Sequence, residues 1–188
     1  KIDGPVSNPN SEVDPVKVGG FTDVNAVAWY AKAVQWALNK GIISDNSHKF
    51  NPDKNCTKAV LYTFLWNAAG SPQSSGSNSF SDVKSTDSYY YASIWAKEKG
   101  LVSGATFNPN AQVTRGELVV SLWKYLGSPE GMQANQYLDI ESHQSDFGRA
   151  VAWSHINSVM GGTDMHKFSP KKKCTRAEVI NIMHRALK

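Results

Sequence analysis

The sequence predicts an all-α protein made of three helix–loop–helix repeats. One observation is an internal repeat with a period of 57 to 61 residues, the spacing of Thr57, Thr114 and Thr175. Another is that apolar side chains recur at three- and four-residue spacing on both sides of each repeat's loop, which is typical of amphipathic helices. A chain that repeats at this period is built from one supersecondary unit used several times.

The first helix of each repeat follows a short motif with an aromatic residue and, two positions later, an aspartate. The three copies are Phe21-Thr-Asp23-Val24, Phe80-Ser-Asp82-Val83 and Tyr137-Leu-Asp139-Ile140. The apolar spacing predicts first helices over residues 29–40, 87–99 and 146–157. Each carries Ala-x-x-Trp, with the tryptophans at Trp36, Trp95 and Trp153. Five residues after each Trp comes Gly41, Gly100 or Ser158, and glycine is a common helix stop.

The second helix of each repeat follows a loop with a Phe-x-Pro motif. The motifs are Phe50-Asn-Pro52, Phe107-Asn-Pro109 and Phe168-Ser-Pro170. A threonine five residues after each proline marks the start of helices predicted over 58–69, 115–126 and 176–187. The second and third repeats carry capping boxes, with Glu117 and Glu178 three residues after the threonine. The first repeat has Val60 there, so its cap is incomplete.

These patterns divide the chain into a polar tail over 1–20 and repeats over 21–72, 80–129 and 137–188. Each helical pair shows apolar residues on more than one side, and such a unit is completed by stacking on its neighbours. We therefore expect three repeats that share one core.

Composition and motifs exclude several classes of function. The net charge is +4, but Lys and Arg are scattered, and Lys171–Lys173 is the only basic run, so we expect no nucleic-acid partner. No apolar run of about 18 residues exists, so we expect no membrane insertion. The two cysteines and five scattered histidines do not have the spacing of metal ligands, and no nucleophile or phosphate-loop motif is present. The sequence therefore predicts no enzyme, no metal and no cofactor.

Taken together, these motifs resemble the S-layer homology repeat over about 21–70, 80–127 and 137–188. Thr175-Arg176-Ala177-Glu178 has the family's signature letters, and the second copy departs from them at Gly116. The first copy departs at two positions, Lys58 and Val60.

The resemblance implies an all-helical module with pseudo-threefold symmetry around a central bundle. It also implies a non-covalent anchor at the bacterial cell surface, outside the cell. The implied ligand is an acidic secondary cell-wall polysaccharide, often pyruvylated, bound in grooves between repeats. The longer parent chain would carry further domains. In the family, the signature Arg, the first helix and the turn after it line the grooves.

The signature cations are the first candidates for ligand binding. Arg115 and Arg176 fall at the first position of their helices, where free backbone amides and a guanidinium fork together suit a carboxylate. The alternative is that each Arg pairs with a surface acid or with the Glu of its own repeat. Lys58 keeps the charge but not the planar fork, so we expect its groove to be weaker or to serve another role.

The remaining candidates each have a structural alternative. The tryptophans at Trp36, Trp95 and Trp153 are sugar platforms or core residues. The aspartates at Asp23, Asp82 and Asp139 are ligand-binding, or they close their loops through backbone amides. Glycines let a ligand approach the backbone closely, and the candidates follow the first helices at Gly104, Gly161 and Gly162. Cys56 and Cys174 align with Val113, which favours small buried residues over a disulfide.

Two hypotheses therefore remain open. The first is a wall-anchoring module that binds polysaccharide without catalysis. The second is a protein-interaction or self-assembly module in which the same grooves take peptide or a neighbouring subunit, without affinity for glycan.

Overall fold

The protein is described by a computed structural model that covers residues 17–130, 137–142 and 144–188. This part of the chain is helical, with no strand and only isolated bridges. The helices are α1 (Ala31–Asn39), α2 (Lys58–Ala68), α3 (Tyr90–Glu98), α4 (Arg115–Tyr125), α5 (Asp146–Ile156) and α6 (Arg176–Leu187). The prediction of an all-α protein is confirmed. Most of the expected tail, residues 1–16, lies outside the described residues.

Two of the first helices begin later than their apolar pattern predicts. Before α3, the carboxylate of Asp87 accepts a hydrogen bond from the backbone N–H of Lys84 at 2.8 Å. Before α1, the side chain of Asn25 accepts one from the N–H of Val27 at 3.0 Å. Side chains of Asp and Asn that bond nearby amides favour turns over helix. The first apolar residues of each pattern therefore lie in turns.

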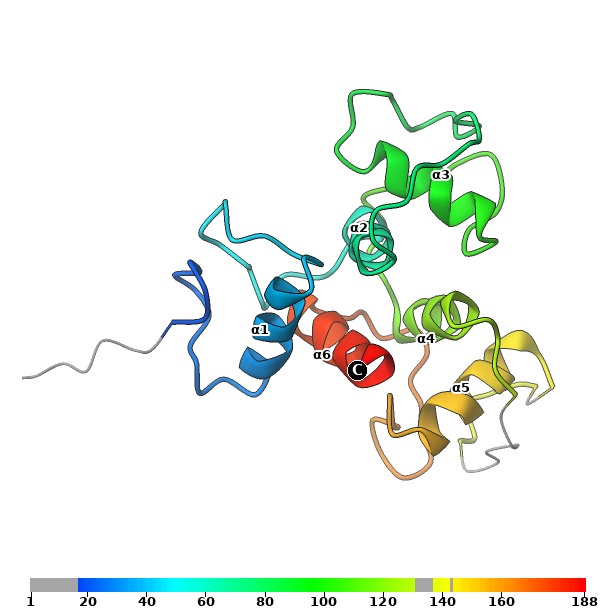
Figure 1. Cartoon of the computed structure of the whole chain (residues 1–188). Coiled ribbons are helices and arrows are strands. Elements are labelled where there is room, and N and C mark those ends of the chain that lie inside the picture. The colour runs from blue at the N-terminus through cyan, green and yellow to red at the C-terminus, as the bar shows by residue number, and fades with distance from the viewer. Residues whose placement is uncertain (1–16, 131–136, 143) are drawn as a thin grey trace, which may run out of the picture.

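The three second helices occupy the centre of the molecule, and the first helices surround them (Figure 1). Each outer helix packs against a central helix from a different repeat: α1 on α6, α3 on α2, and α5 on α4. The two helices of one repeat therefore diverge, and each lobe combines helices of two repeats. This exchange places the start of every central helix at a junction between repeats.

A closed ring of backbone hydrogen bonds joins the three repeats just before the central helices. The N–H of Cys56 donates to the carbonyl of Cys174 at 2.9 Å. The N–H of Cys174 donates to Val113 at 2.9 Å, and that of Val113 donates back to Cys56 at 2.8 Å. All three side chains are buried, which explains why cysteine and valine interchange here.

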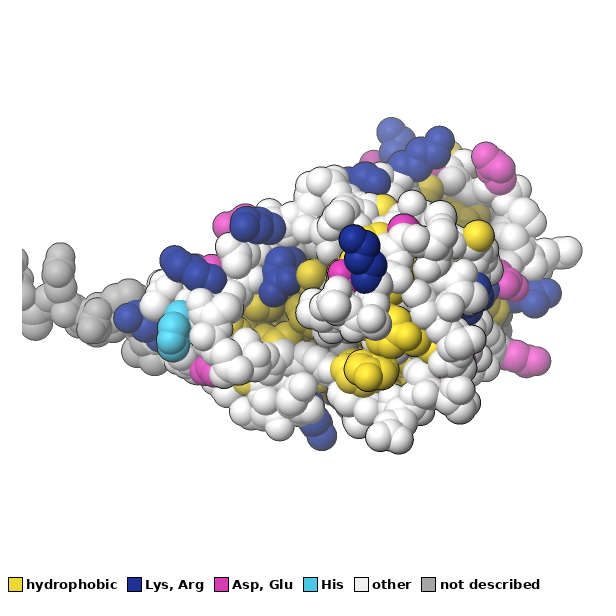
Figure 2. Space-filling view, turned by 90° about the horizontal axis from the view of Figure 1, so that it is seen from above, with side chains coloured by type: hydrophobic (Ala, Val, Ile, Leu, Met, Phe, Trp, Pro, Cys, Tyr) yellow, Lys and Arg dark blue, Asp and Glu magenta, His cyan; other side chains and the backbone are white. Residues whose placement is uncertain are grey.

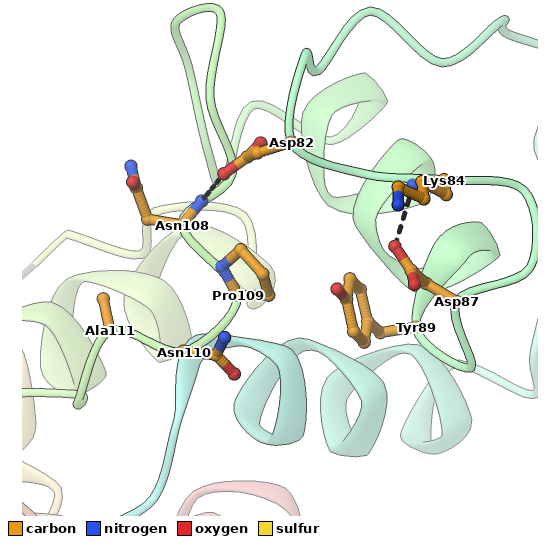
Figure 3. Close-up of a pocket in the computed structure, with 8 residues that line it drawn as sticks. All are labelled: Asp82, Lys84, Asp87, Tyr89, Asn108, Pro109, Asn110 and Ala111. Carbon is orange, nitrogen blue, oxygen red and sulfur yellow. Dashed lines mark hydrogen bonds between the residues drawn. The ribbon is translucent and has the colours of Figure 1, made fainter.

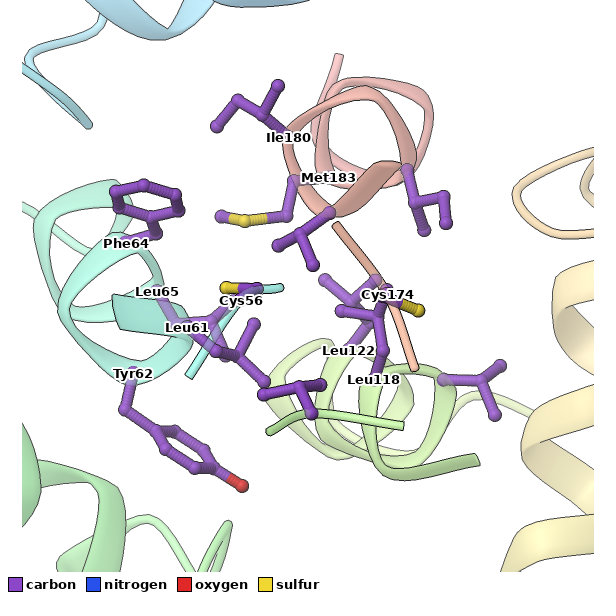
Figure 4. Close-up of a cluster of buried hydrophobic side chains, with 14 of the residues drawn as sticks. Cys56, Leu61, Tyr62, Phe64, Leu65, Leu118, Leu122, Cys174, Ile180 and Met183 are labelled. Atoms are coloured by element: carbon purple, nitrogen blue, oxygen red, sulfur yellow. The ribbon is translucent and has the colours of Figure 1, made fainter. Parts of the chain in front are cut away.

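The shared core lies inside the three central helices, next to this ring. Six of its aliphatic side chains are Leu61, Leu65, Leu118, Leu122, Ile180 and Met183 (Figure 4). Burial of each such side chain contributes roughly 1.5–3 kcal/mol to folding. The sulfur of Cys174 points away from Cys56, and both cysteines are free thiols (Figure 4).

No helix in the described residues has the length and apolar character needed to cross a membrane.

Candidate ligand-binding grooves between the repeats

Each aspartate of the opening motif holds its own Phe-x-Pro loop. The two carboxylate oxygens of Asp139 accept hydrogen bonds from the backbone N–H groups of Phe168 and Ser169, at 2.8 and 2.7 Å. Asp23 and Asp82 bind the equivalent loop residues in the same way. The bond from the Phe107 N–H is the largest cause that lowers the pKa of Asp82. The structure thus gives these carboxylates the loop-closing role.

The loop in turn covers the N-terminus of a central helix from another repeat. In α6, the first amide, that of Arg176, donates to the carbonyl of Lys54 at 2.9 Å. The next amide, that of Ala177, donates to the carbonyl of Pro52 at 3.0 Å. The third amide, that of Glu178, donates to the hydroxyl of Thr175. The first three amides of α4 and of α2 are bonded in the same way. The expectation of free helix amides is therefore wrong: loop carbonyls and the cap occupy them.

The cation at the start of each central helix rests on the buried phenylalanine of the covering loop. Arg176 lies over Phe50, with 5.0 Å between the guanidinium carbon and the ring centroid. Arg115 lies over Phe168 at 4.8 Å, and the Nζ of Lys58 lies 5.5 Å from the centre of the Phe107 ring. In each pair the phenylalanine belongs to a different repeat from the cation. All three cations therefore lie at junctions between repeats.

The protein partners of the two arginines are backbone carbonyls. The Nε of Arg176 donates to the carbonyl of Phe50 at 2.6 Å. Arg115 donates from Nε to the carbonyl of Phe168 at 2.9 Å, and from Nη2 to that of Gly161. Among the described residues, no carboxylate forms an ion pair with either arginine. The alternative that they pair with surface acids is therefore not what the structure shows.

Of the two arginines at the junctions, Arg176 has more donors left for a ligand. Within the described part of the chain, its two terminal nitrogens make no protein hydrogen bond, whereas Arg115 uses one of them. Its guanidinium also lies over Phe64 of α2, at 5.4 Å. Burial lowers the pKa of Arg176, because removal from water disfavours the charged form, although the charge of Asp23 acts in the opposite direction. At the third position of α2, where α4 and α6 carry Glu, the residue is Val60.

A groove of about 420 Å³ lies at the junction that carries Lys58, and we call it the Lys58 groove. Its walls come from α2, from α4 and from the turn over 101–103 that follows α3. Phe147 of α5 closes one side.

Two further cavities lie between an opening motif and its Phe-x-Pro loop. One, of about 490 Å³, is lined by Asp82, Tyr89 and Pro109 among others (Figure 3). The other, of about 660 Å³, is lined by the equivalent residues of the third repeat, Asp139, Phe147 and Pro170. We call this second one the third-repeat loop cavity.

The tryptophans have mainly structural environments. Trp95 and Trp153 have only 3% and 5% of their surface exposed, which leaves no ring face open to a sugar. Trp36 is half-buried, with its ring centroid 5.1 Å from that of His184. The core alternative accounts for Trp95 and Trp153.

The three glycines differ in their surroundings. Gly104 has a φ of +94°, and its carbonyl accepts a hydrogen bond from Lys97 at 2.9 Å. The carbonyl of Gly161 binds Arg115. A Cβ on Gly162 would lie 2.5 Å from the carbonyl oxygen of Asp164, so this position requires glycine.

Sequence reasoning did not single out several residues that shape these junctions. The phenylalanines of the Phe-x-Pro motifs mark the repeat in the sequence, and their fixed spacing from the cations is the signal that points to them. Tyr62 and Ser121, which line the Lys58 groove, give no sequence signal, because the other repeats have different residues at their positions. In the described residues, no cluster of three or more His, Cys, Asp or Glu side chains could hold a metal ion.

Comparison with known families identifies the family to which these repeats belong. The model of the S-layer homology domain matches residues 20–59, 79–119 and 136–180, one segment for each repeat. The chain belongs to the S-layer homology domain family. The three matched segments confirm the three tandem S-layer homology repeats expected from the motifs.

Similar proteins include two surface-layer proteins and a cellulosome-anchoring protein. The chain is 29% identical over 177 residues to an S-layer protein of Bacillus thuringiensis subsp. finitimus, a match that covers 88% of the chain and 21% of that protein. It is 40% identical over 103 residues to the surface-layer 125 kDa protein of Lysinibacillus sphaericus, covering 52% and 9%. A third relative is a cellulosome-anchoring protein of Acetivibrio thermocellus, 28% identical over 152 residues, covering 73% and 33%.

The chain thus spans at most a third of the length of these relatives. The family and the relatives indicate an extracellular location at the cell surface and a non-catalytic module with an anchoring role.

Proposed function

We propose that this S-layer homology module binds an acidic, pyruvylated secondary cell-wall polysaccharide, with Arg176 and Arg115 as carboxylate clamps at the junctions between repeats. The observation that carries the proposal is a guanidinium held at a junction by an aromatic ring and a backbone carbonyl, with no ion pair to a carboxylate of the described residues. A partly buried cation of this kind favours an anion that completes its hydrogen bonds. A pyruvyl ketal presents such a carboxylate on a sugar ring.

The position of the cations supports binding between repeats rather than within one. We propose a pseudo-threefold arrangement of the repeats around the central helices, and the closed ring through Cys56, Val113 and Cys174 supports it. In this arrangement each cation occupies an equivalent junction. The boundaries proposed for the repeats, 21–72, 80–129 and 137–188, follow from the same motifs.

The three junctions differ in their suitability for a carboxylate. Arg176 has two terminal nitrogens without a protein hydrogen bond, and no carboxylate of the described residues forms an ion pair with it. Arg115 has fewer free donors because Gly161 uses one nitrogen. Lys58 offers a point charge rather than a fork. We therefore rank Arg176 first, Arg115 second and Lys58 last as carboxylate sites.

Charged side chains are dispersed over the surface, which favours a local clamp over recognition by a broad basic patch. On the face drawn in Figure 2, lysine and arginine side chains lie scattered, with acidic side chains among them. Binding that depends on one or two partly buried cations should respond less to salt than binding to an exposed basic patch.

The experiment compares purified pyruvylated wall polysaccharide with the same material after mild acid has removed the pyruvyl groups. Titration calorimetry with the chain should show affinity for the intact polymer and at least a tenfold loss with the treated one, because one charge-assisted clamp contributes roughly 1.5–3 kcal/mol. Equal affinity for the two polymers would contradict the clamp, and no affinity for either would contradict polysaccharide binding.

The second candidate function is self-assembly or interaction with another protein. Val27 and Trp29, just before α1, have 89% and 62% of their surface exposed, and exposed apolar side chains that lie together favour protein contacts. Sedimentation equilibrium tests this candidate: association that rises with concentration and disappears in Trp29→Ser, without any glycan affinity, would favour it over anchoring.

A further inference from the structure

The Lys58 groove contains a pair of buried hydroxyl groups. The Oη of Tyr62, on α2, lies 3.0 Å from the Oγ of Ser121, on α4, and donates to the carbonyl of Leu101 at 3.3 Å. Tyr62 and Ser121 are only 4% and 3% exposed, and both line the groove. The groove therefore has a polar floor.

Packing of the central helices does not require this pair. Tyr62 lies five positions after its threonine, and the equivalent residues are Val119 in α4 and Ile180 in α6. Ser121 lies seven positions after its threonine, where α6 has Ile182 and α2 has Phe64. At the other two junctions the equivalent positions therefore carry apolar side chains. Because burial of hydroxyls costs free energy unless they are hydrogen-bonded, an apolar pair would serve the fold equally well.

The hydroxyl pair leaves acceptors, rather than donors, for a ligand. Two hydroxyls have two protons, and bonds to Leu101 and within the pair use both, whereas lone pairs on both oxygens remain. Glu117, also on the wall, binds its cap through Oε2 and leaves Oε1 as a further acceptor. A carboxylate ligand carries only acceptors and does not suit these groups. A sugar unit with hydroxyl or amide N–H groups does.

The charges of the groove favour the same class of ligand. Lys58 and Glu117 both line it, so the formal charge of its wall is zero. In α2, by contrast, the position equivalent to Glu117 carries the uncharged Val60. The Lys58 groove is thus suited to an uncharged ligand.

Glycine at position 116 lets the loop of the third repeat and Phe147 pack closely against the start of α4. The amides of Ala59 and Ala177 make the same bond to a prolyl carbonyl as that of Gly116, so that bond does not require glycine. A Cβ on Gly116 would lie 3.2 Å from the carbonyl oxygen of Pro170 and 3.4 Å from the ring of Phe147, which lines the groove. Phe147 lines both the Lys58 groove and the third-repeat loop cavity, so this residue borders both spaces.

We infer that the Lys58 groove is a separate subsite for an uncharged hydroxyl- or acetamido-bearing sugar unit, recognised by Tyr62 and Ser121 and continued past Phe147 into the third-repeat loop cavity. This inference rests on the proposed function, because it assigns a further unit of the same polysaccharide. The face of the Phe147 ring suits the apolar face of a pyranose.

The test measures binding of two probes, the intact pyruvylated polysaccharide and its depyruvylated form, to Tyr62→Phe and Ser121→Ala. Each variant keeps the shape of the floor and removes one hydroxyl. Each should weaken binding of both probes by the same factor, about fivefold to tenfold, because the lost bond is to an uncharged unit that both probes contain. Matched controls are Tyr137→Phe and Ser93→Ala, which remove buried hydroxyls that do not line the groove. These controls should leave both affinities within about twofold.

Other outcomes separate this inference from the proposed function. Loss confined to the intact probe would show that the hydroxyls act on the pyruvyl carboxylate, which overturns the inference and leaves the proposed function standing. Absence of any binding of the depyruvylated probe to the unaltered chain would overturn it too. If both probes bind equally and both respond to Tyr62→Phe, the inference stands and the carboxylate clamp fails. Unfolding curves establish that each variant is folded, and a crystal structure with the depyruvylated probe checks the contact with Tyr62 directly.

Discussion

Replacement of Asp139 by Asn tests whether the aspartates hold the loops on which the junctions depend. The carboxylate accepts two backbone hydrogen bonds, from Phe168 at 2.8 Å and Ser169 at 2.7 Å. Asparagine has the same shape, but its amide group can accept only one of these bonds and would place an NH₂ against the other backbone donor. Hydrogen bonds to a charged group each contribute about 1.5–3 kcal/mol.

The loss of one bond and of the charge that strengthens the other predicts a decrease of about 3 kcal/mol in the free energy of unfolding. For a chain of this size each kcal/mol corresponds to about 2–4 °C, so the melting temperature should fall by about 6–12 °C. Because the carbonyl of Phe168 binds the Nε of Arg115, the variant should also weaken polysaccharide binding at that junction.

The assay is urea unfolding followed by far-ultraviolet circular dichroism and tryptophan fluorescence. The matched control is Asp146→Asn, because Asp146 has 60% of its side chain exposed and makes one ion pair with Lys124 at 3.8 Å. Exposed pairs of this kind contribute at most about 1 kcal/mol. An Asp139→Asn variant as stable as the Asp146→Asn control would refute the loop-closing role.

Three other predictions concern acid stability, thiol reactivity and glycine. Hydrogen bonding lowers the folded-state pKa of Asp82, so the stabilisation by its carboxylate is present above the unfolded pKa, about 4, and is lost as the pH falls through the folded pKa. Asp82→Asn should therefore flatten the loss of stability below pH 4. Parallel acid-unfolding curves for the variant and the parent chain would contradict this. Burial raises the pKa of Cys56 and of Cys174 to about 12, so neither thiol should react with a thiol reagent at pH 8 until the chain is unfolded. Rapid labelling of the native chain would contradict this, because it would show that the thiols are accessible. Gly162→Ala should lower the free energy of unfolding by about 1–3 kcal/mol through overpacking. The added methyl of Gly161→Ala meets nothing within 4 Å, so this variant should change the free energy of unfolding by less than about 0.5 kcal/mol. Equal stability of the two variants would refute the steric argument.

Local sequence signals predicted the helices well, because their causes are local. The capping boxes at Thr114 and Thr175 form as their spacing predicts, and α4 and α6 begin at the expected residue. The interchange of Cys56 and Cys174 with Val113 correctly indicated small buried side chains.

The sequence repeat does not show which helices pack against one another. Nothing in the helical periodicity of α1 indicates that it packs on α6, because the pattern fixes which face is apolar and not which helix covers it. The same limit applies to the sites. The first position of α6 predicted a cation near free amides, whereas the amide of Arg176 is occupied by the carbonyl of Lys54, a residue 122 positions away in the sequence. Only the guanidinium part of the expected receptor is left.

The polar floor of the Lys58 groove illustrates a second limit. A tyrosine and a serine on different helices carry no joint signal until the fold brings Tyr62 and Ser121 within 3.0 Å. Comparison with the equivalent apolar pairs in the other repeats then becomes informative, because one chain supplies three versions of the same junction.

The most direct test of the account is the affinity of an Arg115→Ala/Arg176→Ala double variant for intact pyruvylated polysaccharide, measured by titration calorimetry beside the exposed control Arg185→Ala. If the arginines at the junctions bind the acidic sugar, the double variant should lose at least about a hundredfold in affinity while its helical content is unchanged, and the control should bind like the parent chain. A folded double variant that binds the polymer as tightly as the parent would contradict the central claim.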